Sequence, residues 1–170
     1  MKINYIKSNF RTSSPSKCFV NRFFKKLHSV RIGVFKEFEN LKITLMKNDF
    51  SFVNVTGAKS LTVLQSFLAF YITSSKTKII SQLKVDSIIG SHKFQKRSNV
   101  SFEELRQRLS SKELSVRDNS KFPGLTIRGF NSYKGSCCVY FRSGVVNFIG
   151  YKKTEEIVRM LKLIETCLYK

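Results

Sequence analysis

Apolar and polar residues change their spacing along the first half of the chain in an order that predicts strands and helices. Alternation with a period of two predicts short strands at 2–9, 30–37, 41–46 and 50–56. Apolar residues that recur every three or four positions predict helices at 18–27 and 61–71. The first half therefore reads as strand, helix, several strands and a second helix.

The second half of the chain restarts the same order. Strands are predicted at 79–89, 124–128, 136–142 and 145–149. Helices are predicted at 101–109, where Ser101 and Glu104 have capping-box spacing, and at 157–168. Repetition of one element order within a single chain indicates an internal duplication.

The repeat is also visible in the residues themselves. Val53-Asn54-x-x-Gly57-x-Lys59 returns as Val146-Asn147-x-x-Gly150-x-Lys152, and a helix follows each copy. We expect two repeats, 1–76 and 77–170, that together form one α+β body. Such repeats predict a continuous antiparallel sheet with long helices on one face, which leaves the other face free to bind.

Alternation within the strands separates the two faces of this sheet. In 136–149 the inward set, which packs under the last helix, is Cys138, Tyr140, Val146 and Phe148. The outward set is Val139, Phe141, Val145, Asn147 and Ile149. The matching outward set in the first repeat is Thr44, Met46, Phe52, Asn54 and Thr56.

Charge narrows the class of partner. The chain carries 31 Lys and Arg against 11 Asp and Glu, a formal net charge of +20 over 170 residues. Its 42% apolar residues argue against a disordered basic tail. The charge favours a polyanion, either nucleic acid or an anionic membrane surface, and charge alone does not choose between them.

Residues for catalysis or metal binding are sparse. The histidines are His28 and His92, and the cysteines, which show no C-x-x-C spacing, are expected to be reduced packing residues. We therefore expect no enzyme activity, no metal site and no cofactor. The N-terminus lacks the apolar stretch of a signal peptide, and no apolar run approaches the length of a spanning helix. The chain is expected to be soluble, not secreted and without a membrane partner.

Several segments resemble the core of the TATA-box-binding protein (TBP) family. They are Val55–Ser60, Lys84–Ser91, Phe122-Pro123-Gly124-Leu125-x-x-Arg128, Val139–Val146 and Gly150-x-Lys152. The resemblance covers about 1–170 and is strongest from 53 to 152. It implies a pseudo-two-fold, duplicated saddle: a curved antiparallel sheet with helices on the convex face and a concave face on the DNA minor groove.

The resemblance also implies roles for particular residues. TBP is itself a standard example of a protein that wedges apolar side chains between base steps. By resemblance the wedges are Phe122, just before a Pro-Gly turn, and Phe141. The first-repeat wedge positions fall near His28 and Met46, and neither residue is Phe. We expect an asymmetric, lopsided saddle, in which the wedge of the second repeat is stronger than that of the first. The alternative is that these large apolar residues belong to the hydrophobic core.

The remaining candidates are groove-face and phosphate-binding residues. The groove-face candidates are Thr44, Asn54, Thr56, Ser87, Pro123, Val139, Asn147 and Ile149. Asn54 and Asn147 stand where the family usually has Val, which would soften a preference for A·T. The phosphate-contact candidates are Lys59, Arg128, Arg142 and Lys152. The alternative reading is that these amides and charges are solvated surface residues.

The resemblance implies a divergent transcription initiation factor that binds A·T-leaning duplex DNA and recruits a transcription factor or polymerase subunit. A monomer would be sufficient, in the nucleus or at a site of viral transcription. The segment 117–121, acidic in the family, is mostly neutral or basic here, which fits a divergent lineage such as a large DNA virus or a reduced parasite. The alternatives are a nucleic-acid-binding module of the same fold without promoter selection and a protein-interaction module.

Overall fold

The computed structural model describes residues 1–170 except 47, 96–98, 113, 120–121, 130–134 and 170, and the side chains of Asn119 and Phe122 also lie outside the described set. The chain divides into two compact units. The first unit is Asn4–Asp86, and the second unit is Met1–Ile3 with Ser87–Lys170. The predicted repeat boundary at 76/77 lies ten residues before this division, and the limits of the repeats stay a prediction.

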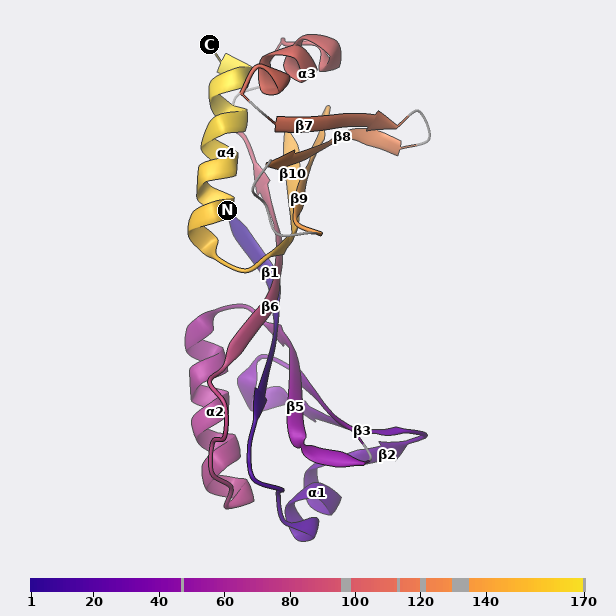
Figure 1. The fold of residues 1–170 in the computed structure, drawn as a ribbon, viewed down its shortest axis with the longest axis vertical. Helices are drawn as coiled ribbons and strands as arrows, with labels where there is room; N and C mark the ends of the chain where they lie inside the picture. Colours follow the sequence, from indigo (N-terminus) through magenta and orange to yellow (C-terminus); the bar gives the residue numbers. More distant parts are fainter. Residues whose placement is uncertain (47, 96–98, 113, 120–121, 130–134, 170) are drawn as a thin grey trace. The chain divides into compact units, whose positions relative to one another are not determined.

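The first unit contains five described strands and two α-helices (Figure 1). The strands are β1 (Lys2–Arg11), β2 (Lys25–Leu27), β3 (Val30–Phe35), β4 (Leu41–Met46) and β5 (Asp49–Ala58). The helices are α1 (Lys17–Phe23), α2 (Leu61–Ser75) and a short 3₁₀ turn, η1 (Lys36–Phe38). The strands are hydrogen-bonded in the order β2-β3-β4-β5-β1.

The second unit repeats this arrangement. Its described strands are β6 (Lys84–Lys93), β7 (Leu114–Asn119), β8 (Phe122–Gly129), β9 (Cys137–Phe141) and β10 (Val145–Tyr151). The division between the units falls within β6, so Asp86 of this strand belongs to the first unit. Its helices are α3 (Phe102–Ser110) and α4 (Thr154–Tyr169). The strand order β6-β10-β9-β8-β7 matches, strand for strand, the order of the first unit read from β1 to β2. The predicted α+β class is confirmed.

Two strands were not predicted from the sequence. The predicted helix 18–27 ends at Phe23, because Phe24 is extended (φ −124°, ψ 130°) and β2 then pairs with β3. The counterpart of β2 in the second unit, β7, pairs with β8. Both strands are short or polar, so their partners rather than their own alternation define them.

The core of the first unit is largely aromatic. Phe19 of α1 meets Tyr71 of α2 edge-to-face at 5.3 Å between ring centroids, and Phe35 of β3 meets Phe67 of α2 at 5.1 Å. All four side chains are buried. Edge-to-face packing adds to the apolar area that these rings remove from water, so both helices are held on one face of the strands.

The core of the second unit contains the inward set predicted from alternation. Cys138, Tyr140, Val146 and Phe148 are all buried. Cys138 Sγ lies 3.3 Å from the Tyr151 hydroxyl, and burial raises the pKa of the Cys138 thiol to about 12. This cysteine is a protonated packing residue, as predicted, whereas Cys18 is exposed.

Serine caps begin three of the helices. Ser16, Ser60 and Ser101 each accept a hydrogen bond from the backbone N–H three residues later, at 3.1–3.2 Å. The Ser101 half of the predicted capping box is confirmed. Arg108 of α3 donates to the carbonyl oxygen of Cys167 at 2.9 Å, which ties α3 to α4.

Equivalent glycines form a bulge just before each long helix. Gly57 (φ 101°) and Gly150 (φ 81°) each add one residue to their strand, where the pairing with β1 or β6 shifts register. Each bulge changes the inward parity: Val55 and Phe148 are buried before it, and Ala58 and Tyr151 after it. The repeated Asn-x-x-Gly motif therefore marks the same structural position in both units.

The Gly150 bulge should be sensitive to a single methyl group. A Cβ at Gly150 would lie 2.5 Å from the Gly135 carbonyl oxygen, whereas a Cβ at Gly144 (φ 79°) would meet its nearest atom at 3.9 Å. Gly144→Ala should cost about 1 kcal/mol of unfolding free energy through its positive φ alone. Gly150→Ala should cost about 2–3 kcal/mol, because a backbone clash is added. Urea unfolding measures both, and equal losses would contradict the assigned bulge.

Candidate nucleic-acid interface

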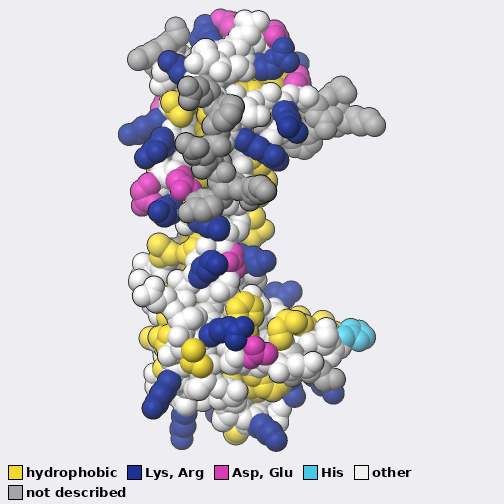
Figure 2. Space-filling view, viewed as in Figure 1, with side chains coloured by type: hydrophobic (Ala, Val, Ile, Leu, Met, Phe, Trp, Pro, Cys, Tyr) yellow, Lys and Arg dark blue, Asp and Glu magenta, His cyan; other side chains and the backbone are white. Residues whose placement is uncertain are grey.

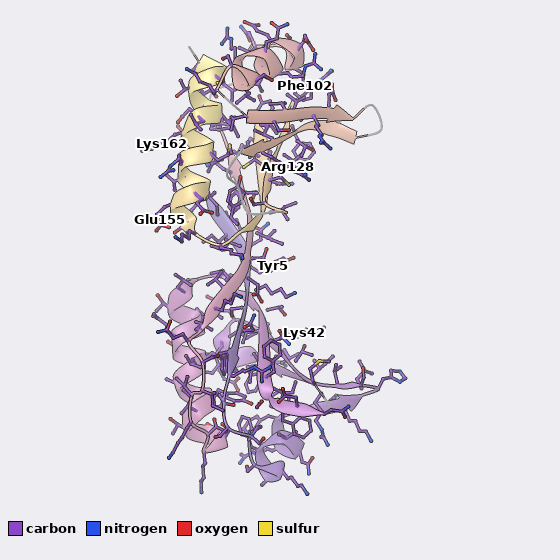
Figure 3. The ribbon with its side chains drawn as sticks, viewed as in Figure 1. Tyr5, Lys42, Phe102, Arg128, Glu155 and Lys162 are labelled. Atoms are coloured by element: carbon purple, nitrogen blue, oxygen red, sulfur yellow. The ribbon has the colours of Figure 1, made fainter. Side chains whose placement is uncertain are left out.

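Each unit has a sheet face that is turned away from its helices, and this face carries the predicted groove residues. We call the face of the first unit, opposite α1 and α2, the first open face. Its members alternate with the buried residues of each strand. They are Lys7, Asn9, Arg11, Val30, Ile32, Val34, Lys42, Thr44, Met46, Phe52, Asn54 and Thr56. Figure 3 shows Lys42 projecting on the side of the strands away from α2.

A polar row crosses the middle of the first open face. Asn54 lies directly opposite Asn9 in β1 and opposite Thr44 in β4, so these side chains are cross-strand neighbours. Asn9 Nδ2 donates to Asp86 Oδ2 at 2.6 Å, which adds a carboxylate from β6 to the row. All four residues are half-buried.

Cations flank this row on the next pairs of the ladder. Lys7 and Lys42 both pair with Thr56, one from each neighbouring strand, and both lysines are exposed. The Thr56 hydroxyl donates to the Lys42 carbonyl oxygen at 3.3 Å. The two lysines lie on the strands to either side of Thr56. Exposed lysines in such positions are typical contacts for a phosphate backbone.

On the other side of the row, Arg11 interacts with the side chains of Phe52 and Asp49. Its guanidinium lies 5.3 Å from the centroid of the Phe52 ring and 3.6 Å from the Asp49 carboxylate. A side-chain hydrogen bond from Ser51 lowers the pKa of Asp49, and Arg11 acts in the same direction. Both side chains are exposed, so this ion pair contributes little to stability.

The position predicted for the first-repeat wedge is a hollow at the end of β4. Met46 is 44% exposed and pairs with Val30. It lines the hollow together with His28, which sits at φ 43° in the turn between β2 and β3, and with Asp49. His28 and Met46 therefore line the same hollow, where the apolar group is a flexible thioether.

The second unit presents a corresponding face opposite α3 and α4, which we call the second open face. Its central row is Ser91, Asn147, Val139, Thr126 and Arg117, each paired with the next. Asn147 thus occupies the place that Asn54 occupies in the first unit. Ile149, 40% exposed, pairs with Cys137 on the same face.

The wedge candidates of the second unit lie on neighbouring strands. Phe141 is half-buried and pairs with Gly124. The backbone of Phe122 pairs with Asn119, and the Phe122 side chain lies outside the described residues. The predicted Pro-Gly turn is wrong: Pro123 and Gly124 lie inside β8, which runs from Phe122. Pro123 is exposed in this strand.

The phosphate-contact candidates do not form one group. Arg128 is exposed and pairs with Ser115 on the second open face (Figure 3). The Arg142 guanidinium lies 5.0 Å from the centroid of the Phe102 ring at the start of α3, so Arg142 turns to the helix side instead. Lys59 and Lys152 stand at the two strand-to-helix junctions, and Ser87 is half-buried at the start of the second unit.

Sequence reasoning missed several residues of these faces. Asn9 and Lys7 alternate outward within the strand predicted at 2–9, and Lys42 does so within 41–46, so period two alone could have found them. Arg117 lies on β7, which was not predicted. Nothing in the sequence indicates the Asn9–Asp86 hydrogen bond, because it joins residues 77 positions apart.

Positive charge is spread over both units. Figure 2 shows Lys and Arg side chains on each of them, with fewer Asp and Glu in this view. Among the described residues, no three His, Cys, Asp or Glu side chains gather as a metal site would require. No helix in the described part of the chain is long and apolar enough to cross a membrane.

The fold is similar to that of a solved TBP. The structure of TBP from Methanococcus jannaschii matches with a TM-score of 0.64 and 16% identity, over 98% of this chain and 97% of that chain. This match shows a TBP-like fold. A complex of A. aeolicus tRNASec with M. kandleri SerRS matches at a TM-score of 0.43 and 10% identity, over 99% of this chain and 31% of that chain. No protein-family model matches the sequence, and no curated protein matches it.

Proposed function

We propose that the chain is a TBP-like, non-enzymatic factor that binds duplex DNA in the minor groove through its two open faces. The observation that carries the proposal is the correspondence of the faces: Asn54 and Asn147 occupy equivalent central positions, one in each unit. A net charge of +20 supports a polyanionic partner. Ile149, an exposed apolar residue of the second open face, favours an A·T-leaning site, where no guanine amino group obstructs the groove floor.

The proposal extends to transcription initiation. The helical faces of α2 and α4 are then available for a transcription factor or polymerase subunit, and a monomer supplies both halves of the DNA-binding surface. The protein would act in the nucleus or at a site of viral transcription. These roles follow from the proposed DNA binding and have their own tests in partner binding and localisation.

A second candidate is a module of this fold that binds nucleic acid or protein without selecting promoters. Met46 favours it, because the first open face has a flexible thioether where the second has the Phe141 ring.

Selection of bound duplexes from a random pool near physiological salt separates the two candidates. The promoter-factor proposal expects an enriched motif that is bent when bound. The general module expects tight binding without a motif, and a protein-interaction module expects weak binding at this salt concentration.

Lys7 and Lys42 should contribute to binding through phosphates. Lys7→Gln and Lys42→Gln should each weaken binding to all sequences and reduce the salt slope of the binding constant by about 1. Titrations at several salt concentrations measure the slope. Lys162→Gln on α4, which makes the same charge change on the helix side, should leave the slope nearly unchanged. Equal effects of all three variants would contradict binding through the first open face.

Phe141 should act as a wedge between base steps. Phe141→Ala should remove most of the DNA bend in the half-site bound by the second unit, while binding at low salt survives. Energy transfer between two dyes on the duplex measures the bend. The control is Val158→Ala, an exposed apolar residue of α4. A normal bend with Phe141→Ala would remove the wedge assignment.

The two central asparagines should relax the preference for A·T. Asn54→Val combined with Asn147→Val removes amides that can accept from a guanine amino group, so the selected motif should become richer in A·T. Sequencing of the selected pools measures this change. An unchanged motif would mean that neither amide faces a base.

A further inference from the structure

The first open face carries a polar cluster, and the hydrogen bond within this cluster determines which donor and acceptor groups remain available to a ligand. The cluster consists of Asn9, Asp86 and Asn54. Asn9 Nδ2 lies 2.6 Å from Asp86 Oδ2, and Asn54 stands directly opposite Asn9 in the ladder. All three residues belong to the first unit, so the cluster is complete within one compact body.

The carboxylate determines how the Asn9 amide is turned. A carboxylate only accepts hydrogen bonds, so the amide nitrogen of Asn9 must face Asp86. The bond is charge-assisted and short, which holds this orientation. The Asn9 carbonyl oxygen therefore points away from Asp86, and the pair presents acceptor oxygens: Asn9 Oδ1 and the lone pairs of the Asp86 carboxylate that remain.

The minor groove offers one kind of donor to such acceptors. A·T pairs expose only the acceptors adenine N3 and thymine O2, whereas a G·C pair adds the N2 amino group of guanine. Acceptors placed against an A·T pair would be left desolvated and unpaired, which penalises that pair. We propose that the Asn9–Asp86 pair is a guanine-reading element, which selects a G·C pair through its minor-groove amino group. This inference rests on the proposed binding of DNA by the open faces.

The second unit lacks this arrangement at the corresponding place. Ser91 pairs with Asn147 where Asn9 pairs with Asn54, and Val139 replaces Thr44 on the next strand. The described central row of the second open face, which is Ser91, Asn147, Val139, Thr126 and Arg117, contains no carboxylate. The half-site contacted by the first unit should therefore contain the G·C pair, and the selected motif should be asymmetric.

Inosine tests the inference with the unmodified protein. Inosine differs from guanine only by the absence of the N2 amino group, so its major-groove edge is unchanged. In the selected duplex, replacement of the guanine by inosine should weaken binding about tenfold, the size of one good base contact. Equal affinity for the guanine and inosine duplexes would overturn the inference while leaving duplex binding intact.

Variants assign the effect to the cluster. Asp86→Asn keeps the shape but frees the Asn9 amide to turn, so this variant should bind the guanine and inosine duplexes within about twofold of each other. Glu155→Gln on α4 makes the same charge change on the helix side and should keep the tenfold difference (Figure 3). If Asp86→Asn, with unfolding like the wild type, still prefers guanine, the cluster does not read the base. If the wild type binds no duplex at all, the proposed function fails first and this inference falls with it.

Discussion

Burial of one sheet face under the helices is the constraint on which the rest of the structure depends. In β5, Val53 and Val55 are sealed beneath α2, and in β10, Val146 and Phe148 are sealed beneath α4. Because side chains alternate, burial of these residues turns their neighbours outward, and a slip of one residue would bury the polar set instead. The amides of Asn54 and Asn147 reach the open faces for this reason, so the packing of the core determines what the surface can bind.

The glycine bulges let this constraint continue into the helices. If the strand kept strict alternation up to the junction, Ala58 and Tyr151 would face away from the core. One extra residue at Gly57 or Gly150 shifts the phase, so that Ala58 and Tyr151 point inward as the chain leaves the sheet. The same Gly-x-Lys spacing then delivers Lys59 and Lys152 to equivalent junctions. Repetition of this device in both units supports the reading of the chain as a duplication.

The sequence was informative where periodicity is strong. Alternation predicted the strand 41–46 with its observed ends, because burial on one side leaves a clear period of two there. In β9 the period is weaker, because Val139, predicted to face outward, is buried together with Tyr140. It failed where long-range partners decide the outcome. The helix predicted to reach Leu27 ends at Phe23, since pairing with β3 overrides local spacing. Arg142 turns toward Phe102, and Asp86 reaches Asn9, through contacts that no local pattern encodes.

The two units share one strand order but differ in the side chains of their open faces. This difference would affect the direction in which the protein binds a duplex. A duplicated protein with identical faces would bind a duplex equally well in two opposite directions. Here Met46 of the first unit corresponds to Phe141 of the second unit at the proposed wedge positions, and the Asn9–Asp86 pair corresponds to Ser91 in the central rows. Each 1.4 kcal/mol by which the two half-sites distinguish the two faces changes the ratio of orientations tenfold. Under the proposed binding of DNA, these two differences, one in side-chain stiffness and one in hydrogen bonding, would both favour one direction of binding over the other.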